Sequence, residues 1–179
     1  MTDSLLPHAP SLDEPLEMLE ACHGRIEAQL QTLERLLVYL PQHGADDQAR
    51  QAARNILRYF DLAGPNHHED EERSLFPTLI ARAGVDETAA VQSLVQNLLS
   101  DHVRMAVALD VVRMQLTPIA DGTGSALEEA AVRRMAELYR QHIAKENRDL
   151  LPLSRRLLQT PDLEELSRAM TARRTPRSD

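Results

Sequence analysis

The sequence contains a single cysteine and no long apolar run, and each shortage excludes a class of protein. Cys22 is the only cysteine in 179 residues, so no disulfide can form within the chain and a reducing compartment is expected. No apolar run approaches the roughly 20 residues of a membrane span. A basic segment followed by an apolar run, the pattern of a secretory signal, is also missing. We therefore expect a cytoplasmic protein with no membrane segment.

Lysine is almost absent, and acidic residues outnumber basic ones. Lys145 is the only lysine, and the formal net charge is −8. Such a charge argues against general binding to nucleic acid. We therefore interpret the arginines near the end of the chain as a solvated end and not as a nucleic-acid patch; they are Arg168, Arg173, Arg174 and Arg177.

Tryptophan is missing and aromatic residues make up 3% of the chain, whereas Leu, Ala, Glu and Arg are abundant. This composition favours helices. Apolar residues recur at alternating spacings of three and four in segments 13–40, 47–74, 86–116 and 125–158. Asp86 is the expected N-cap of the third segment, and Pro65 is expected to kink the second.

These patterns predict an all-α fold, an up-down-up-down four-helix bundle with a short extra C-terminal helix. The bundle is expected at residues 13–158, after a flexible N-terminal arm at residues 1–12. A short helix and tail should follow at residues 159–179, starting at Thr160 and Pro161 and frayed from Thr171.

Two eleven-residue segments repeat one pattern of polar residues. HHEDEERSLFP begins at His67 and HIAKENRDLLP begins at His142, and they share His, Glu, Leu and Pro at matching positions. His67 and Glu71 thus correspond to His142 and Glu146. Residues four apart lie on one face of a helix, so each pair can close on one metal ion.

Two single histidines repeat a second pattern. His23 opens HGRIEAQL and His102 opens HVRMAVAL, and each replaces an aliphatic residue in an otherwise apolar seam. Counted along the predicted helices, these histidines and the two pairs differ in height by at most roughly 5 Å. One such histidine is more often an ordinary core residue. Four histidines and two glutamates facing one interior predict a metal cluster, because burying them without a partner is costly.

The register after Pro65 leaves an alternative open. Leu75, Phe76 and Leu79 also suit a frame in which His68 and Glu72 face inward. We favour His67 and Glu71, because only that frame matches the later repeat. His68 is then a neighbour or a supporting group, and we interpret Glu69, Asp70 and Glu72 as a solvated acidic run.

These motifs resemble the hemerythrin-like, His-His-Glu cation-binding domain family over about residues 15–158. The resemblance implies an up-down four-helix bundle that holds two non-haem iron ions joined by an oxo or hydroxo bridge. It also implies terminal ligands at His23, His67, His102 and His142, with bridging carboxylates at Glu71 and Glu146.

Two departures from the oxygen-carrying members bear on function. The second histidine that those members carry one turn after the third ligand is Ala106 here, and their final aspartate is replaced by Glu146. We therefore predict a di-iron protein that responds to O2, NO, peroxide or iron, with a separate and unspecified protein partner. The alternatives are a di-iron enzyme (peroxidase, NO reductase or iron donor for iron–sulfur repair), reversible oxygen storage, and a structural bundle with zinc or no metal.

Overall fold

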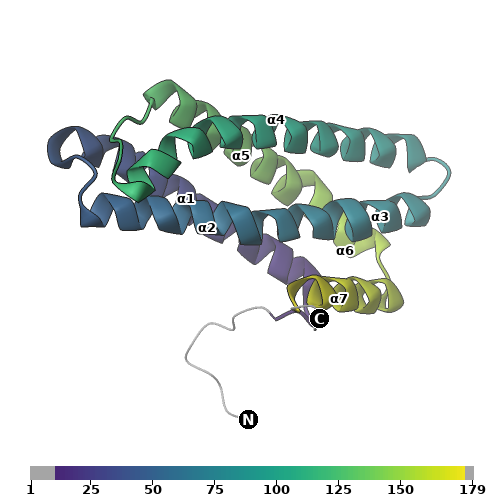
Figure 1. Ribbon diagram of the computed structural model, residues 1–179. Coiled ribbons are helices and arrows are strands. Elements are labelled where there is room, and N and C mark those ends of the chain that lie inside the picture. The colour runs from purple at the N-terminus through teal and green to yellow at the C-terminus, as the bar shows by residue number, and fades with distance from the viewer. Residues whose placement is uncertain (1–10, 176–179) are drawn as a thin grey trace, which may run out of the picture.

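The computed structural model describes residues 11–175, and within that range every regular element is a helix (Figure 1). Four segments are long: α1 (Pro15–His43), α2 (Asp47–Asp70), α4 (Thr88–Asp121) and α5 (Glu129–Lys145). A π-helical turn, η1 (Glu71–Leu75), joins α2 to α3 (Phe76–Arg82), and a second one, η2 (Glu146–Leu150), joins α5 to α6 (Leu151–Leu157). The last helix is α7 (Thr160–Arg174).

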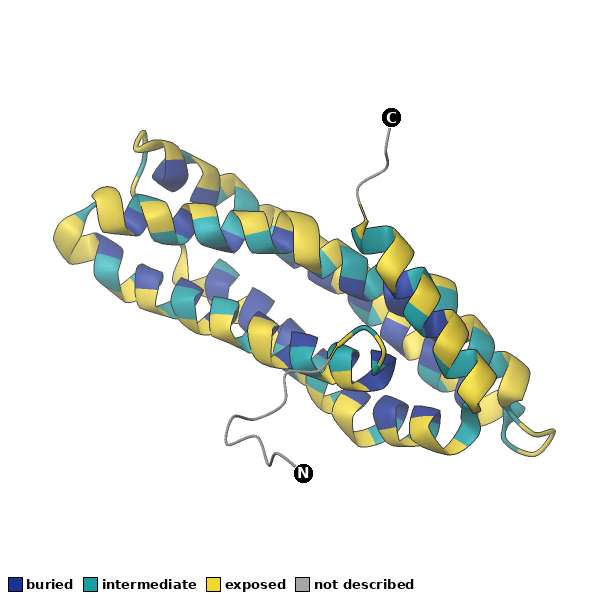
Figure 2. Ribbon diagram, turned by 90° about the horizontal axis from the view of Figure 1, so that it is seen from below, coloured by how far each residue is buried: buried dark blue, intermediate teal, exposed yellow. Residues whose placement is uncertain are grey.

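The four long helices form a closed ring of contacts. Helix α1 packs on α2 and α5, while α4 packs on the same two helices. Each helix turns its buried residues inward and its exposed residues to solvent (Figure 2). The chain therefore folds as a helical bundle, which confirms the predicted all-α class. None of the helices in the described part is long and apolar enough to cross a membrane.

The apolar core consists of two clusters separated along the bundle. Leu19, Leu75 and Leu98 belong to one cluster, and Ile26 and Met105 belong to the other. The break falls at one level in every long helix, and that level carries the histidines and glutamates of the repeated motifs. The bundle thus holds a buried polar layer between two apolar halves.

Several predicted boundaries are wrong. The second helical segment runs past Ser74 to Arg82, because η1 continues into α3. Asp86 is not an N-cap, since α4 begins at Thr88 after Glu87 and no side chain caps it. Helix α4 also continues through Pro118 until Gly122, where a positive φ of 75° ends it.

The fourth segment starts later than predicted, at Glu129 in place of Ser125. The backbone N–H of Glu128 donates to the side-chain oxygen of Gln115, which holds the preceding residues in an extended connection. The second segment remains helical through Pro65, and its irregular turn comes later, at η1.

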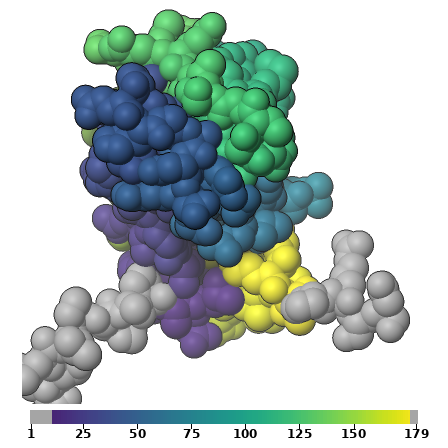
Figure 3. Space-filling view, turned by 60° about the vertical axis from the view of Figure 1, so that its left-hand side comes forward, coloured from purple at the N-terminus to yellow at the C-terminus, as the bar shows by residue number. Residues whose placement is uncertain are grey.

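The C-terminal helix lies against the bundle and is not a frayed end up to Arg174. Figure 3 shows α7 in yellow beside the purple start of α1, and α7 also packs on α2 and η1. Arg173 and Arg174 bind Asp70, so the prediction of a solvated end is wrong for these two arginines. Arg177 and the first ten residues of the predicted arm lie outside the described residues.

Candidate metal centre

All six residues predicted as ligands meet in the polar layer between the two apolar clusters. The long helices supply the histidines, and the first residue of each π turn supplies a glutamate. Every one of the six is at most 5% exposed. They are His23, His67, Glu71, His102, His142 and Glu146.

Their donor atoms form two groups that share both carboxylates. His23 and His67 lie with Glu71 and Glu146 in one group, in which the donor atoms are within 4.8 Å of one another. His102 and the histidine of α5 lie with the same two carboxylates in the other. The layer therefore offers two adjacent metal positions.

Glu146 spans the two positions with its two oxygens. Its Oε2 lies 3.0 Å from His23 Nε2, and its Oε1 lies 3.0 Å from His142 Nε2. Two ligands about 2.1 Å from one ion and at a right angle are about 3 Å apart, so these distances are compatible with groups that share an ion. His102 Nε2 and His142 Nε2 are also 3.0 Å apart.

Glu71 spans the same two positions from the opposite helix pair. Its Oε1 lies 3.6 Å from His67 Nε2, and its Oε2 lies 3.4 Å from His102 Nε2. Each glutamate thus turns one oxygen to each group, which is the arrangement of a carboxylate that bridges two cations.

Comparison with known families agrees with this geometry, because the model of the hemerythrin HHE cation-binding domain matches residues 14–154. The chain belongs to the hemerythrin HHE family. It is also similar to a protein of Haemophilus influenzae strain Rd, described as uncharacterized, with 30% identity over 162 residues. That match covers 90% of this chain and 91% of the relative.

Outer hydrogen bonds orient two histidines of this hemerythrin domain. His23 Nδ1 lies 2.8 Å from Asn147 Oδ1, and His102 Nδ1 lies 2.6 Å from Glu72 Oε1. If each Nδ1 donates, each Nε2 presents its lone pair to the cluster, as in protein metal sites. Glu72 is therefore more than part of a solvated run, although its side chain is 41% exposed. The sequence pattern predicted neither of these hydrogen bonds. The one signal for them is position, since Glu72 and Asn147 each directly follow a glutamate of the repeat.

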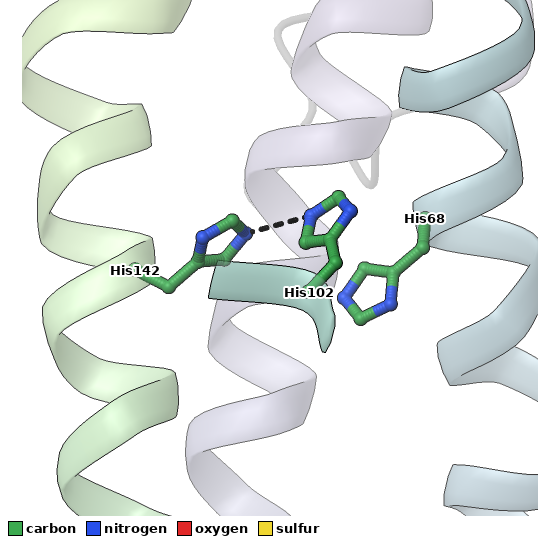
Figure 4. Close-up of side chains that lie close together, drawn as sticks. All are labelled: His68, His102 and His142. Atoms are coloured by element: carbon green, nitrogen blue, oxygen red, sulfur yellow. Dashed lines mark hydrogen bonds between the residues drawn. The ribbon is translucent and has the colours of Figure 1, made fainter. Parts of the chain in front are cut away.

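The histidines of both predicted registers, His67 and His68, lie at the cluster. His67 and Glu71 lie inside, while the His68 ring stacks on the His102 ring with centroids 4.0 Å apart. A His68 nitrogen also lies within 4.8 Å of donor atoms of His102 and His142 (Figure 4). Both registers therefore contact the cluster, at different places.

Burial controls the protonation of these groups. Desolvation lowers the pKa of His67 to about 3 and also lowers the pKa of His102, where the nearby His142 adds to the effect. A lowered pKa favours the neutral imidazole at His67 and His102, which is the state that binds a cation. Desolvation and the nearby Glu146 raise the pKa of Glu71 well above its usual range.

Glu146 behaves differently from Glu71. Burial raises its pKa, but contacts with His142 and His23 outweigh burial and lower it well below the usual range. The two carboxyls therefore differ in proton affinity, which is higher at Glu71 than at Glu146. A cation between them would compete with protons for Glu71.

The residues present fit a metal centre. Both ring nitrogens of His67 are buried and make no hydrogen bond, which is costly unless another partner binds them. Imidazole nitrogen and carboxylate oxygen are ligands for first-row transition metals. The geometry and the family together indicate that this site binds metal cations.

Proposed function

We propose that the chain is a non-haem di-iron protein that responds to O2, NO, peroxide or iron supply. The observation that carries the proposal is the pair of carboxylates, Glu71 and Glu146, each with one oxygen turned to each histidine pair. Two histidines and two shared carboxylates for each metal give a nitrogen and oxygen donor set that suits iron.

The roles of the side chains follow from their positions. His23 and His67 would hold one iron, and His102 and His142 the other, with the glutamates between them. Iron bound there would supply redox chemistry with small oxidants. The surrounding apolar clusters exclude bulk water, which strengthens the electrostatic contacts within the layer.

We also propose the order of the long helices, the cellular location of the protein and its partners. An up-down-up-down order of the long helices is supported by their ring of contacts. We also propose a cytoplasmic location, no binding of nucleic acid or membrane, and a separate protein partner for signalling. The single cysteine and the net charge of −8 support these points.

Elemental analysis with an anaerobic optical spectrum tests the proposal. About two irons per chain are expected, as six ligands shared between two positions imply. The oxidised protein should show the charge-transfer absorption of bridged ferric ions. Glu146→Gln should lower the iron content, whereas Glu129→Gln, at an exposed position, should leave it unchanged. Zinc alone, or no metal, in protein from iron-rich cultures would contradict the proposal.

A di-iron enzyme is the second candidate, and the carboxylate-rich layer favours it. Two glutamates at each metal position support easy oxidation, which a peroxidase or an NO reductase requires. Anaerobic mixing with limiting and excess peroxide or NO, in the presence of a chemical reductant that returns the irons to the ferrous state, separates the candidates. Repeated turnover indicates an enzyme, and a single stoichiometric reaction indicates a sensor.

A further inference from the structure

A pocket lies beside one of the two metal positions. A pocket of about 260 Å³ opens between α2, α4 and α5 beside the His102–His142 position. Its lining contains His68 but none of the six cluster residues. The pocket is lined by Phe60, Gly64, Pro65, His68, Ala106, Leu109, Asp110, Arg113 and Tyr139.

His68 is the side chain between this pocket and the cluster. It lines the pocket, and its ring stacks on the His102 ring at an interplanar angle of 18°. The His68, His102 and His142 donor atoms form a group that could itself hold a metal ion (Figure 4). A ring rotation at His68 would therefore either cover or open that side of the cluster.

The pocket suits small, uncharged molecules. Its walls are mainly apolar, and its volume is below the roughly 300 Å³ at which pockets for drug-sized ligands begin. The one basic group in the wall, Arg113, is already bound by Asp61 and Asp110 at 2.7 Å. A hydrated anion would find no free positive charge there. Ala106 contributes only a methyl group, which keeps the pocket open.

We propose that small uncharged ligands reach the His102–His142 metal through this pocket, and that His68 holds the exchangeable position until a ligand displaces it. The inference rests on the proposed di-iron function. It assigns the exchangeable position to one of two metals that have equal numbers of protein ligands. Displacement exchanges one neutral donor for another, so it requires no electron and no proton.

Filling the pocket tests the route. Nitric oxide is mixed with the anaerobic diferrous protein, and the rate of the optical change is measured. Ala106→Phe should slow binding by about tenfold or more, because the ligand must wait for the wall to move. Gly64→Val is a second pocket-filling variant, since a Cβ there meets only Phe60, at 3.7 Å. Val107→Phe is the matched control, because Val107 is 63% exposed and outside this pocket.

Replacing His68 by alanine tests whether this side chain controls access to the cluster. His68→Ala should bind NO faster than the wild type and should retain two irons. Loss of one iron in this variant would show that His68 is a permanent ligand. An unchanged rate of NO binding would show that His68 does not limit access to the metal. Either result overturns its assignment. Equal rates in Ala106→Phe, Gly64→Val and the wild type, with iron content intact, overturn the route.

A measurement without metal separates this inference from the proposed function. Xenon binds apolar cavities, so the change in its NMR shift between the metal-free wild type and a pocket-filling variant reports on this pocket. Xenon should bind the wild type and Val107→Phe but not Ala106→Phe. A wild type that binds xenon but no iron refutes the di-iron function alone. A wild type that binds two irons, with NO rates indifferent to pocket filling, refutes the route alone.

Discussion

His67 and His68 are adjacent in the chain but meet different parts of the cluster. Successive residues on a helix point about 100° apart, so two neighbours cannot face one point. His67 faces Glu71 and the buried layer, while His68 faces His102 and the pocket. From the sequence, His67 and His68 were alternatives, because each helix was expected to turn a single His–Glu pair toward the interior.

Replacement of these two histidines should have unequal effects on metal content. His67→Ala removes a buried donor that has no substitute, so iron content should fall well below that of the wild type. His68→Ala should keep both irons. His43→Ala is the control, because His43 is exposed and stacks on Tyr39 far from the layer. Iron loss in His68→Ala with retention in His67→Ala would falsify the register.

Acid should destabilise the metal-free protein. Burial lowers the pKa of His67, His68 and His102 from 6.5. Below pH 6.5 these three imidazoles therefore bind protons in the unfolded chain but not in the folded chain. Their stabilising contribution is complete above pH 6.5 and is lost as the pH falls. Glu71 acts in the opposite direction, since its raised pKa favours folding at low pH, but it is one group against three.

Urea unfolding at pH 7, 6 and 5 measures this effect. Each net proton changes the free energy of unfolding by about 1.4 kcal/mol per pH unit. The decrease with acid should be smaller in His67→Leu, which lacks one of the three imidazoles. A free energy of unfolding that stays constant between pH 7 and pH 5 contradicts this account.

The two π turns carry Glu71 and Glu146 into the polar layer, and a proline follows two residues after each turn. In a regular helix the ring of Pro77 would clash with the carbonyl of Arg73, and Pro152 would clash with that of Arg148. Helices α2 and α4 contain Pro65 and Pro118 without such a turn, so proline alone does not account for it. In η1 the N–H of Phe76, the residue before Pro77, bonds to the carbonyl of Glu71. The second turn repeats this bond between Leu151 and Glu146.

The repeat predicted the His-Glu pairs, but periodicity could not reveal the wider turns. Each π turn adds one residue to the helix after the His-Glu pair. The pair therefore stays four residues apart, and only the residues that follow change the face on which they lie. His102 was singled out for a similar reason, because it interrupts an apolar seam in α4. Its bond to Glu72 was missed, since Glu72 stands among exposed acidic residues and its partner is distant in sequence.

Helix α7 binds the bundle through a buried ion pair that the sequence did not predict. Asp70 is fully buried, and its oxygens lie 2.8 Å from Arg173 Nη1 and 2.6 Å from Arg174 Nη2. Arg173 also donates to Ser74. An acidic run and an arginine-rich end each appear solvent-facing when considered alone. Only the folded chain brings them together beside the Glu71 ligand.

Removing both arginines should destabilise the fold strongly. The double variant Arg173→Ala, Arg174→Ala leaves the Asp70 carboxylate buried and unpaired, which should cost about 3–5 kcal/mol. Arg168→Ala is the control, because Arg168 is exposed on the same helix, and it should change stability by at most about 0.5 kcal/mol. Equal urea midpoints for the two variants would show that the ion pair contributes nothing.

For the whole molecule, the polar layer makes stability depend on metal. Metal that binds only the folded chain adds stability by mass action, about 2.7 kcal/mol when free metal is 100 times the dissociation constant. Chelation should therefore lower the melting temperature of the wild type. The Glu146→Gln variant, already deficient in metal, should respond less. An unchanged melting curve after verified metal removal would show that other partners satisfy the buried groups.

The reaction with oxygen depends on the complete donor set. Each metal position has two imidazoles and two shared carboxylates, and carboxylates favour ferric over ferrous iron. Ala106, which replaces a histidine of the oxygen carriers, is exposed at the pocket and cannot coordinate. We therefore expect air to convert the reduced protein to the diferric form, without a long-lived oxygenated form. Stopped-flow mixing of the diferrous protein with oxygen measures this. An oxygenated spectrum that persists and reverses under vacuum would restore oxygen storage as the leading function.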